Sequence, residues 1–278
     1  MADTHAPPPD EPLVEHPEPV SLKGMVPPVM IELRDVSKKL GDRTVLDNIS
    51  LQVYKGETLC ILGGSGQGKS VTLKHIVGLM RPDSGSVLVE GIDISHTRNG
   101  ELEEARKKIG FLFQNGALLN SMNVYENVAL PLREHEQLPE PEIRRRVEEK
   151  LAVVGMSDAI SKMPAVLSGG MKKRASLARA IIRNPDIMLY DEPTAGLDPI
   201  ISATINQLIL DIQKKLGVTS ILVTHDMSSA FRVSNRMAML WKGKILKIGT
   251  KEEFRTSDDP MIKQFVHGES EGPLRLNE

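Results

Sequence analysis

Apolar residues occur along this chain in short runs and in longer stretches with helical spacing. The short runs predict strands at 29–33, 45–53, 58–62, 87–89, 187–190 and 220–223. The longer stretches predict helices at 69–80, 141–154, 169–182 and 200–216, with a short helix near 260–266. The runs 237–240 and 244–248 flank Lys242-Gly243, which predicts a hairpin.

The order of these elements predicts an α/β protein with a layered core around a largely parallel sheet, because strands alternate with helices. The first strands are expected to form an antiparallel subdomain, and residues 116–180 a helical insertion. No internal repeat is visible, so one catalytic unit is expected at 29–249, followed by a polar tail at 250–278. Residues 1–28 hold eight prolines and five acidic residues, which predicts a disordered arm.

The composition argues against several classes of function. A formal net charge of −2 gives no bulk attraction to nucleic acid, and 3% aromatic residues argue against a base-stacking platform. The single cysteine, Cys60, lies in an apolar run, rules out an internal disulfide framework and fits a reducing compartment. No apolar stretch approaches the roughly 18–20 residues of a membrane-spanning helix, and residues 1–28 lack signal-peptide features. Work at a membrane is therefore expected to require docking to other chains.

A glycine-rich loop between a predicted strand and a predicted helix carries the first candidate chemistry. Its residues are Gly63, Gly64, Ser65, Gly66, Gln67, Gly68, Lys69 and Ser70, followed by Val71, and they fit the phosphate-binding pattern G-x-x-x-x-G-K-[ST]. Glycines let backbone N–H groups point at phosphate oxygens, and the helix N-terminus adds a favourable dipole. Lys69 is expected to reach the β- and γ-phosphates of a nucleotide, and Ser70 to ligate Mg²⁺. The alternative is a glycine-rich structural turn.

A second candidate is the apolar run 187–190, which ends in Asp191 and Glu192. Asp191 is expected to hold Mg²⁺, mostly through water, and Glu192 to polarise the attacking water as a general base. Taken alone, two acids at a strand end are more often just a solvated terminus. The phosphate-binding loop makes the catalytic interpretation the stronger one.

Between these motifs, Leu167-Ser168-Gly169-Gly170-Met171 resembles the LSGGQ-type signature of ABC ATPases, with Met171 where the family more often has glutamine. Three further elements follow the family order: Gln114 in Phe113-Gln114-Asn115, Asp198 in Ala195-Gly196-Leu197-Asp198, and His225 in Val223-Thr224-His225-Asp226. The resemblance covers about residues 29–249. It implies a P-loop NTPase (RecA-like) core with an antiparallel β subdomain and a helical ABC subdomain.

The resemblance also implies roles for these residues. Ser168, Gly169 and Gly170 would bind the γ-phosphate of an ATP held by a second copy of the chain, so that two ATPs lie between two subunits. The alternative for this stretch is an ordinary helix N-cap. Gln114 would touch Mg²⁺ and link the core to the helical subdomain, His225 would contact the γ-phosphate, and Asp198 would communicate across the dimer.

One position departs from the family pattern. Many ABC ATPases stack the adenine ring on an aromatic residue about two dozen positions before the phosphate-binding loop, and the matching residue here is Leu40. Tyr54 is out of register for that role. Weaker discrimination between ATP and GTP is therefore expected than in a relative with the aromatic residue.

The type of ABC protein follows from the spacing and from a closer resemblance. Gln114 and Ser168 are only 54 positions apart, which leaves no room for the long coiled coil of the DNA-repair relatives. Translation-associated relatives usually carry two ATPase units in one chain, whereas this chain has one.

Several further stretches are similar to MCE-associated (Mla-type) phospholipid transport ATPases. They are residues 114–119, 122–124 and 127–135, with Asp259-Pro260, Gln264-Phe265 and Gly272-Pro273.

That family implies a homodimer at the cytoplasmic face of the inner membrane, with permease subunits, an MCE-domain lipid-binding protein and sometimes a small STAS-domain protein. It also implies that the tail reaches the partner ATPase. A permease helix is expected to dock at 118–125, where Leu118, Leu119, Met122, Val124 and Tyr125 are the apolar candidates; the alternative is that they form the subdomain core. Transport of another solute, a soluble ATP-driven switch and a non-hydrolysing scaffold are the rival functions.

Overall fold

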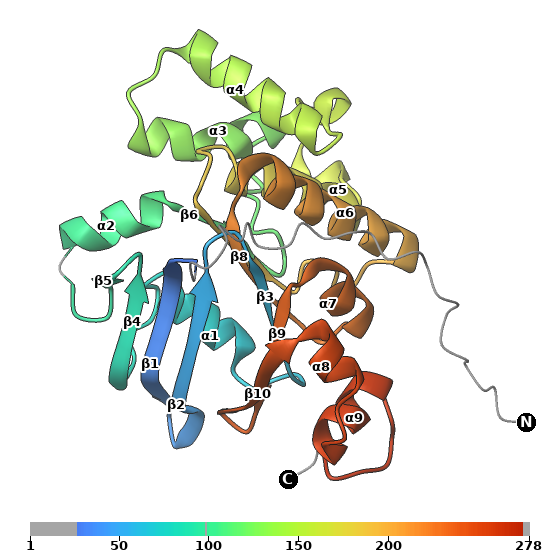
Figure 1. Cartoon of the computed structure of the whole chain (residues 1–278). Coiled ribbons are helices and arrows are strands. Elements are labelled where there is room, and N and C mark those ends of the chain that lie inside the picture. The colour runs from blue at the N-terminus through green and yellow to red at the C-terminus, as the bar shows by residue number, and fades with distance from the viewer. Residues whose placement is uncertain (1–26, 98, 275–278) are drawn as a thin grey trace, which may run out of the picture.

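The computed structural model describes residues 27–97 and 99–274, and a six-stranded sheet lies at its centre (Figure 1). In spatial order, the sheet contains β10 (Lys244–Thr250), β9 (Arg236–Trp241), β3 (Thr58–Leu62), β8 (Thr219–Thr224), β7 (Ile187–Asp191) and β6 (Ile109–Leu112). The strands from β9 to β6 are parallel, and β10 is antiparallel to β9. The carboxyl ends of β3, β8 and β7 therefore lie side by side, at the edge where parallel sheets bind ligands.

A second sheet is antiparallel and covers one side of the central sheet. It contains β2 (Arg43–Tyr54), β1 (Val29–Leu40), β4 (Ser84–Val89) and β5 (Ile92–Asp93), in that spatial order. This confirms the predicted α/β class with an antiparallel subdomain. The first strand continues to Leu40, well beyond the predicted end at residue 33.

The central strands are buried on both faces. In β3, Leu59 and Ile61 pack in a cluster with the antiparallel sheet, whereas Cys60 and Leu62 pack in the cluster under the helices. Because successive side chains of a strand point to opposite faces, a strand between two cores needs an unbroken apolar run. All five residues of β3 and all five of β7 are accordingly buried.

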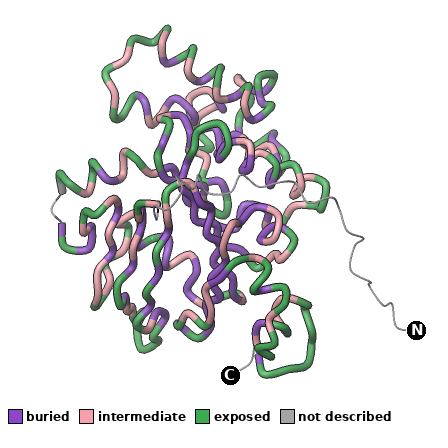
Figure 2. Tube along the Cα trace, viewed as in Figure 1, coloured by how far each residue is buried: buried purple, intermediate pink, exposed green. Residues whose placement is uncertain are grey.

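A helical layer forms the other end of the molecule (Figure 1). It contains α3 (Val124–His135), α4 (Glu140–Val153), two 3₁₀ turns (Ser157–Ala159 and Pro164–Val166) and α5 (Gly169–Ala180). The inner side of α4 is buried through Ile143, Val147 and Leu151, while its outer side is exposed (Figure 2). At the start of α3, the Asn123 side chain accepts from the Glu126 N–H at 2.9 Å, and the Glu126 carboxylate accepts from the Asn123 N–H at 2.8 Å. This capping box sets where α3 begins.

The other helices flank the sheets: α1 (Lys69–Ile76), α2 (Asn99–Lys107), α6 (Pro199–Leu216), α7 (Met227–Val233), α8 (Lys251–Arg255) and α9 (Pro260–His267). After α9 the chain folds back, and the Leu274 N–H donates to the Gln264 side-chain oxygen at 2.7 Å. In the stretches 27–97 and 99–274, no helix has the length and apolar character needed to cross a membrane.

Some predicted boundaries differ from the structure. The helix that begins at Lys69 ends at Ile76 rather than at residue 80, and Gly78 follows with a φ of 67°. Strand β6 and helix α7 were not predicted, because four and seven residues are too few for a clear periodicity. The predicted arm at 1–28 falls almost wholly on residues 1–26, outside the described residues.

Candidate nucleotide-binding and catalytic site

The glycine-rich loop connects the end of β3 to the start of α1. Gly68 precedes the helix with a φ of 102°, and a Cβ atom there would lie 2.9 Å from the Val45 carbonyl oxygen. Only glycine fits this position without strain. The Lys69 side chain, 6% exposed, turns back over the loop, and its ammonium donates to the carbonyls of Gly63 at 2.8 Å and Gly64 at 3.0 Å.

Ser70 and Asp191 meet across adjacent elements. The Ser70 hydroxyl, in the first turn of α1, donates to the Asp191 carboxylate at the end of β7 at 2.8 Å. Burial raises the pKa of Asp191 above its ordinary value, because the charged carboxylate has lost water. Hydroxyl and carboxylate oxygens beside a phosphate-binding loop are donors that suit Mg²⁺, which usually takes few protein ligands and keeps several waters. Clusters of three or more His, Cys, Asp and Glu that could hold a metal without a nucleotide do not occur among the described residues.

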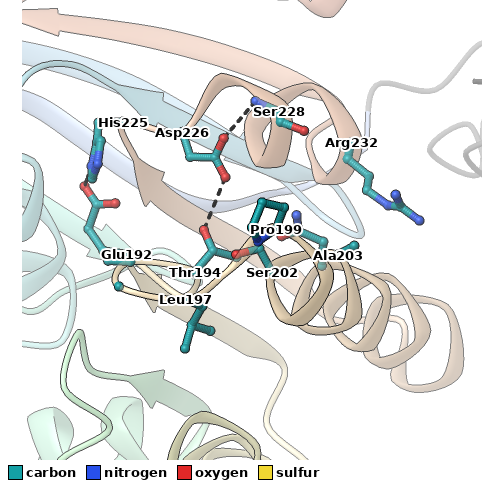
Figure 3. Close-up of a pocket in the computed structure, with 13 residues that line it drawn as sticks. Glu192, Thr194, Leu197, Pro199, Ser202, Ala203, His225, Asp226, Ser228 and Arg232 are labelled. Carbon is teal, nitrogen blue, oxygen red and sulfur yellow. Dashed lines mark hydrogen bonds and ion pairs between the residues drawn. The ribbon is translucent and has the colours of Figure 1, made fainter. Parts of the chain in front are cut away.

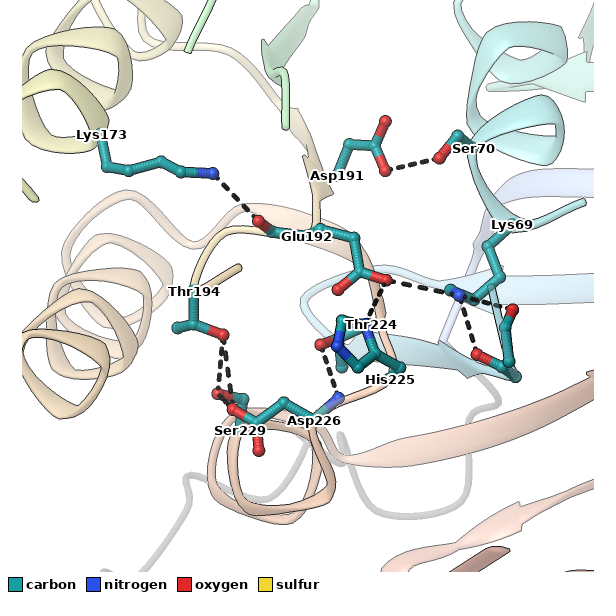
Figure 4. A network of polar contacts seen from close by, with 12 residues as sticks. Lys69, Ser70, Lys173, Asp191, Glu192, Thr194, Thr224, His225, Asp226 and Ser229 are labelled. Atoms are coloured by element: carbon teal, nitrogen blue, oxygen red, sulfur yellow. Dashed lines mark hydrogen bonds and ion pairs between the residues drawn. The ribbon is translucent and has the colours of Figure 1, made fainter. Parts of the chain in front are cut away.

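Glu192 follows Asp191 with its carboxylate at the centre of a polar network (Figure 4). One carboxylate oxygen lies 3.0 Å from the His225 Nδ1 atom and 3.3 Å from the Lys69 ammonium. The other oxygen is buried and has no hydrogen-bond partner among the described residues. The His225 side chain is 55% exposed, so the network opens to solvent through the histidine. An unsatisfied carboxylate oxygen beside the phosphate-binding loop is able to accept a proton from a bound water.

Gln114 and Lys173 join this network through the main chain. The buried Lys173 ammonium, on α5, donates to the Gln114 carbonyl and, at 3.0 Å, to the Glu192 carbonyl. The Gln114 side chain is exposed at the end of β6. Sequence reasoning missed Lys173, although its register with buried Gly170 and Leu177 on α5 is a signal for an inward-facing residue.

Glu192 and His225 also line a pocket of about 400 Å³ (Figure 3). The loop 194–197, the start of α6 and the start of α7 line it. On its wall, the Thr194 hydroxyl lies 3.4 Å from the Asp226 carboxylate and 3.3 Å from the Ser229 hydroxyl. Asp198 caps α6 by accepting from the N–H groups of Ile200 and Ile201, both at 3.0 Å, which is a local structural role.

The signature stretch lies at the start of α5. Ser168 caps the helix, accepting from the Met171 N–H at 3.3 Å, so the N-cap interpretation is correct for this side chain. A hydroxyl that accepts this bond still has a proton to donate. Ser168 and Gly169 are exposed, whereas a Cβ atom on Gly170 would lie 2.6 Å from the Ile201 side chain. The first turn of α5 is therefore open on one side and closely packed on the other.

Leu40 lies where the predicted base-binding residue was expected. It lines a hollow of about 370 Å³ with Val45, Val71 and the loop residues Gly66, Gly68, Lys69 and Ser70. Leu40 is 45% exposed, so its side chain is available to a ligand. Arg43 lines the same hollow and donates to the Gly66 carbonyl at 3.0 Å. Sequence reasoning missed Arg43.

The predicted site residues thus fall into two groups. Lys69, Ser70, Asp191, Glu192 and His225 are joined by direct contacts, and Leu40 lies beside them. The second group, at the start of α5 and α6, lies on the exposed surface around Ser168 and Asp198. A profile of the ABC transporter family matches residues 46–195, which include Lys69, Ser70, Asp191, Glu192 and the signature, while Leu40 and His225 lie outside this range.

This chain belongs to the ABC transporter ATP-binding family. Accordingly, it binds ATP and hydrolyses it. It is 43% identical over 258 residues to the probable ribonucleotide transport ATP-binding protein Mkl of Mycobacterium tuberculosis, covering 93% of this chain and 72% of that protein. It is 44% identical over 247 residues to the intermembrane phospholipid transport system ATP-binding protein MlaF of Haemophilus influenzae, covering 89% and 94%. MlaF of Escherichia coli K12 is 41% identical over 245 residues, covering 88% and 91%.

Solved ABC ATPases share the fold. The dimeric ATP-binding cassette MJ0796, in a post-hydrolysis state with ADP and Pi, superposes with a TM-score of 0.74 at 34% identity, covering 80% of this chain and 98% of that one. The protein cbiO1 of Clostridium perfringens, part of the transporter complex cbiONQ, gives a TM-score of 0.74 at 32% identity, covering 82% and 91%. The predicted ABC ATPase fold is confirmed.

Leu40 leads to a prediction for this ABC ATPase. Leu40→Tyr should raise ATP affinity about fivefold, or roughly 1 kcal/mol, because stacking of a base on an aromatic ring is worth about 1–3 kcal/mol. An aliphatic contact reads no base edge, so the natural chain should discriminate weakly between ATP and GTP. Binding titrations with both nucleotides test this. Unchanged affinity in the variant, or an ATP preference above roughly 100-fold in the natural chain, contradicts the expectation.

Proposed function

We propose that this chain is the ATPase of a phospholipid transporter and acts as a homodimer on permease subunits. The ATPase domain is assigned to 29–249 with its helical subdomain at 116–180, and the tail at 250–278 to a dimer contact. Lys69 binds the β- and γ-phosphates, and the glycine-rich loop wraps them with its N–H groups. Ser70 and Asp191, with Gln114, would hold Mg²⁺, which would supply positive charge beside the phosphates when bound.

The proposed hydrolysis is carried by Glu192. Its unpaired carboxylate oxygen accepts a proton as the water oxygen bonds to the γ-phosphorus and the bond from the γ-phosphorus to the ADP oxygen breaks, while His225 holds the other carboxylate oxygen in place. The His225 contact restricts rotation of the carboxylate, so the accepting oxygen is oriented before the reaction. His225 is exposed on one side and is free to contact the γ-phosphate.

The exposed start of α5 supports a composite site. Ser168 and Gly169 face solvent at a helix N-terminus, where N–H groups favour an anion. The ATP-binding cassette MJ0796 is dimeric, and in a dimer of this chain these groups would bind the γ-phosphate held by the partner's loop. ATP then closes the dimer, and hydrolysis with phosphate release reopens it.

A groove between the core and the helical layer is the observation that carries the transport function. Its volume is about 410 Å³, and Phe111 and Phe113 stack in its wall with ring centroids 4.1 Å apart. Residues of β6, α2, α3 and α5 and of the segments that follow β6 and α5 line it, including Ala117, Leu130, Pro131, His135, Arg179 and Arg183. The lining combines apolar residues with four cationic side chains and the acidic Glu134. A groove of this composition between two subdomains suits a short permease helix, because movement of one subdomain against the other would displace a helix bound there.

The predicted docking residues need revision. Of the five apolar candidates between 118 and 125, only Leu119 is exposed. Val124 is buried, and Leu118 and Tyr125 pack against the helical-side core. The core interpretation is therefore correct for most of them. We assign permease docking to the groove instead.

Phospholipid is the proposed substrate because MlaF proteins of two organisms match nearly the whole chain, and because residues 114–135 resemble Mla-type ATPases. The partners are then permease subunits, an MCE-domain protein and, in some systems, a STAS-domain protein, at the cytoplasmic face of the inner membrane. A ribonucleotide substrate is the second candidate, since Mkl is equally similar in sequence.

Affinity purification from detergent-solubilised membranes tests this function, with mass spectrometry of the bound proteins and lipids. Recovery of a permease, an MCE-domain protein and phospholipid is the expected result. A permease with bound ribonucleotide would favour the second candidate, and purely soluble partners would contradict transport.

The groove itself gives a sharper prediction. Ala117→Arg places bulk and positive charge in the groove, so permease recovery should fall roughly tenfold or more. ATP affinity of the isolated chain should stay unchanged, because Ala117 does not line the hollow between Leu40 and the glycine-rich loop, which we call the nucleotide hollow. Leu246→Arg, an exposed position on β10, is the matched control. Full permease recovery with Ala117→Arg would place the docking surface elsewhere.

A further inference from the structure

Lys173 is a buried cation that contacts two main-chain carbonyls of the candidate site. Its side chain is 5% exposed, and its ammonium donates to the carbonyls of Gln114 and Glu192. Burial lowers the pKa of Lys173 to about 8, which reflects how far the ammonium has been withdrawn from water. A lysine is rarely this buried unless its donors are satisfied, so both contacts are built into the fold.

The two carbonyls belong to neighbouring strands. Gln114 follows β6 and Glu192 follows β7, and these strands pair in parallel with Leu112 opposite Tyr190. Lys173 approaches them from a third element, the helix α5, and Figure 4 shows its contact with the Glu192 carbonyl. One ammonium therefore joins the helical layer to the ends of two core strands.

Glu192 has a backbone conformation that needs support. Its φ is 46°, in the left-handed region that a residue with a Cβ atom seldom adopts. Its N–H donates to the Val223 carbonyl of β8 at 3.0 Å, and its carbonyl accepts from the Lys173 ammonium at 3.0 Å and from the Ala195 N–H at 3.2 Å. The peptide groups on both sides of Glu192 are thus held, one by the sheet and the other by the turn to Ala195 and by Lys173 of α5.

We propose that Lys173 is a positioning residue that couples the position of α5 to the orientation of the Glu192 carboxylate. This inference rests on the proposed role of Glu192 as the general base. The same helix begins with the signature residues, so a shift of α5 on dimer closure or permease docking moves the ammonium. That movement changes the support of the Glu192 peptide, and the carboxylate turns toward or away from the water it activates.

The chemistry of the side chain defines the test variants. Methionine has a similar length and shape but no donor, so Lys173→Met removes the side-chain donor from both carbonyls and leaves the Glu192 carbonyl with the Ala195 N–H alone. Lys173→Arg keeps a charged donor at nearly the same reach. Lys172→Met is the matched control, because Lys172 is the neighbouring lysine on the same helix and only half-buried.

The experiment measures kcat and KM for ATP with the full chain. Lys173→Met should lower kcat by on the order of 10²-fold, the effect of misplacing a catalytic group by about 1 Å. KM should stay within about threefold, because Lys173 does not line the nucleotide hollow. Lys173→Arg should recover most of the lost kcat, and Lys172→Met should behave as the natural chain does.

Several outcomes overturn the inference. A Lys173→Met chain with undiminished kcat, or a loss of kcat that Lys173→Arg does not recover, removes the positioning role. If Lys173→Met fails to fold, Lys173→Gln provides the test, since its amide retains N–H donors. An intermediate kcat with unchanged KM supports the role, and a wild-type kcat overturns it.

Glu192→Gln distinguishes the positioning role of Lys173 from the role of Glu192 as the general base. Unchanged turnover in Glu192→Gln removes the base and this inference together, whereas abolished turnover with an unaffected Lys173→Met chain removes the positioning role alone.

Discussion

Glu192→Gln should reduce ATP turnover by about 10²–10⁴-fold, the usual contribution of a general base. The amide has nearly the shape of the carboxylate, and its oxygen still accepts from His225, so the site should keep its geometry. It cannot take the proton of the attacking water. ATP binding should persist, because Lys69 and the loop N–H groups remain, and the ATP-bound dimer should accumulate.

Steady-state phosphate release and sedimentation of the ATP-bound chain measure these two effects. Glu148→Gln, an exposed substitution on α4, serves as the control and should leave both unchanged. Turnover at the level of the natural chain would show that another group activates the water. Loss of ATP binding in the variant would instead indicate that Glu192 supports the loop through its contact with Lys69.

Lys69→Ala should weaken ATP binding by roughly 10- to 100-fold. Hydrogen bonds to charged groups contribute about 1.5–3 kcal/mol each, and the substitution removes the loop's cation from the β- and γ-phosphates. It also leaves the Glu192 carboxylate with only His225 as a partner. The uncompensated acid adds repulsion toward the nucleotide, so affinity should fall more than turnover of the bound complex.

A fluorescent ATP analogue gives the dissociation constant directly. Lys214→Ala, on the exposed side of α6, is the charge-matched control and should bind as the natural chain does. The two variants are expected to fail differently: Lys69→Ala loses binding, and Glu192→Gln keeps binding and loses hydrolysis. Natural affinity in Lys69→Ala would contradict the assignment of this lysine to the phosphates.

Much of the fold could be predicted because the central strands are buried on both faces. An unbroken apolar run such as 58–62 is easily recognised, and a βα alternation then predicts the layers. Strand β6 was missed because its run is short and contains Gly110, which packs against Met188 and the Ala180 carbonyl. Its pairing with β7 stabilises it, and pairing between distant segments leaves little trace in a local pattern.

Some residues of the candidate site could be predicted from the sequence, and others could not. Gly63–Ser70 and Asp191-Glu192 are contiguous in sequence, so the residue types and their spacing predict the chemistry. Lys173 and Arg43 could not be found by this route, because each acts through a main-chain carbonyl many positions away. The groove could not be predicted either, because Phe111 and Phe113 come to line one surface with Leu130 and Pro131 only in the folded chain.

The placement of Cys60 inside β3 has a practical consequence. The chain has no other cysteine, and burial raises the pKa of this thiol well above its ordinary value, so the reactive thiolate is scarce in the folded protein. Alkylating reagents should reach it only when β3 separates from β8 and β9. The rate at which Cys60 is modified therefore measures how often the central sheet opens. A fluorophore or spin label attached to a cysteine introduced on the surface would report from that single position, with the natural thiol left in place.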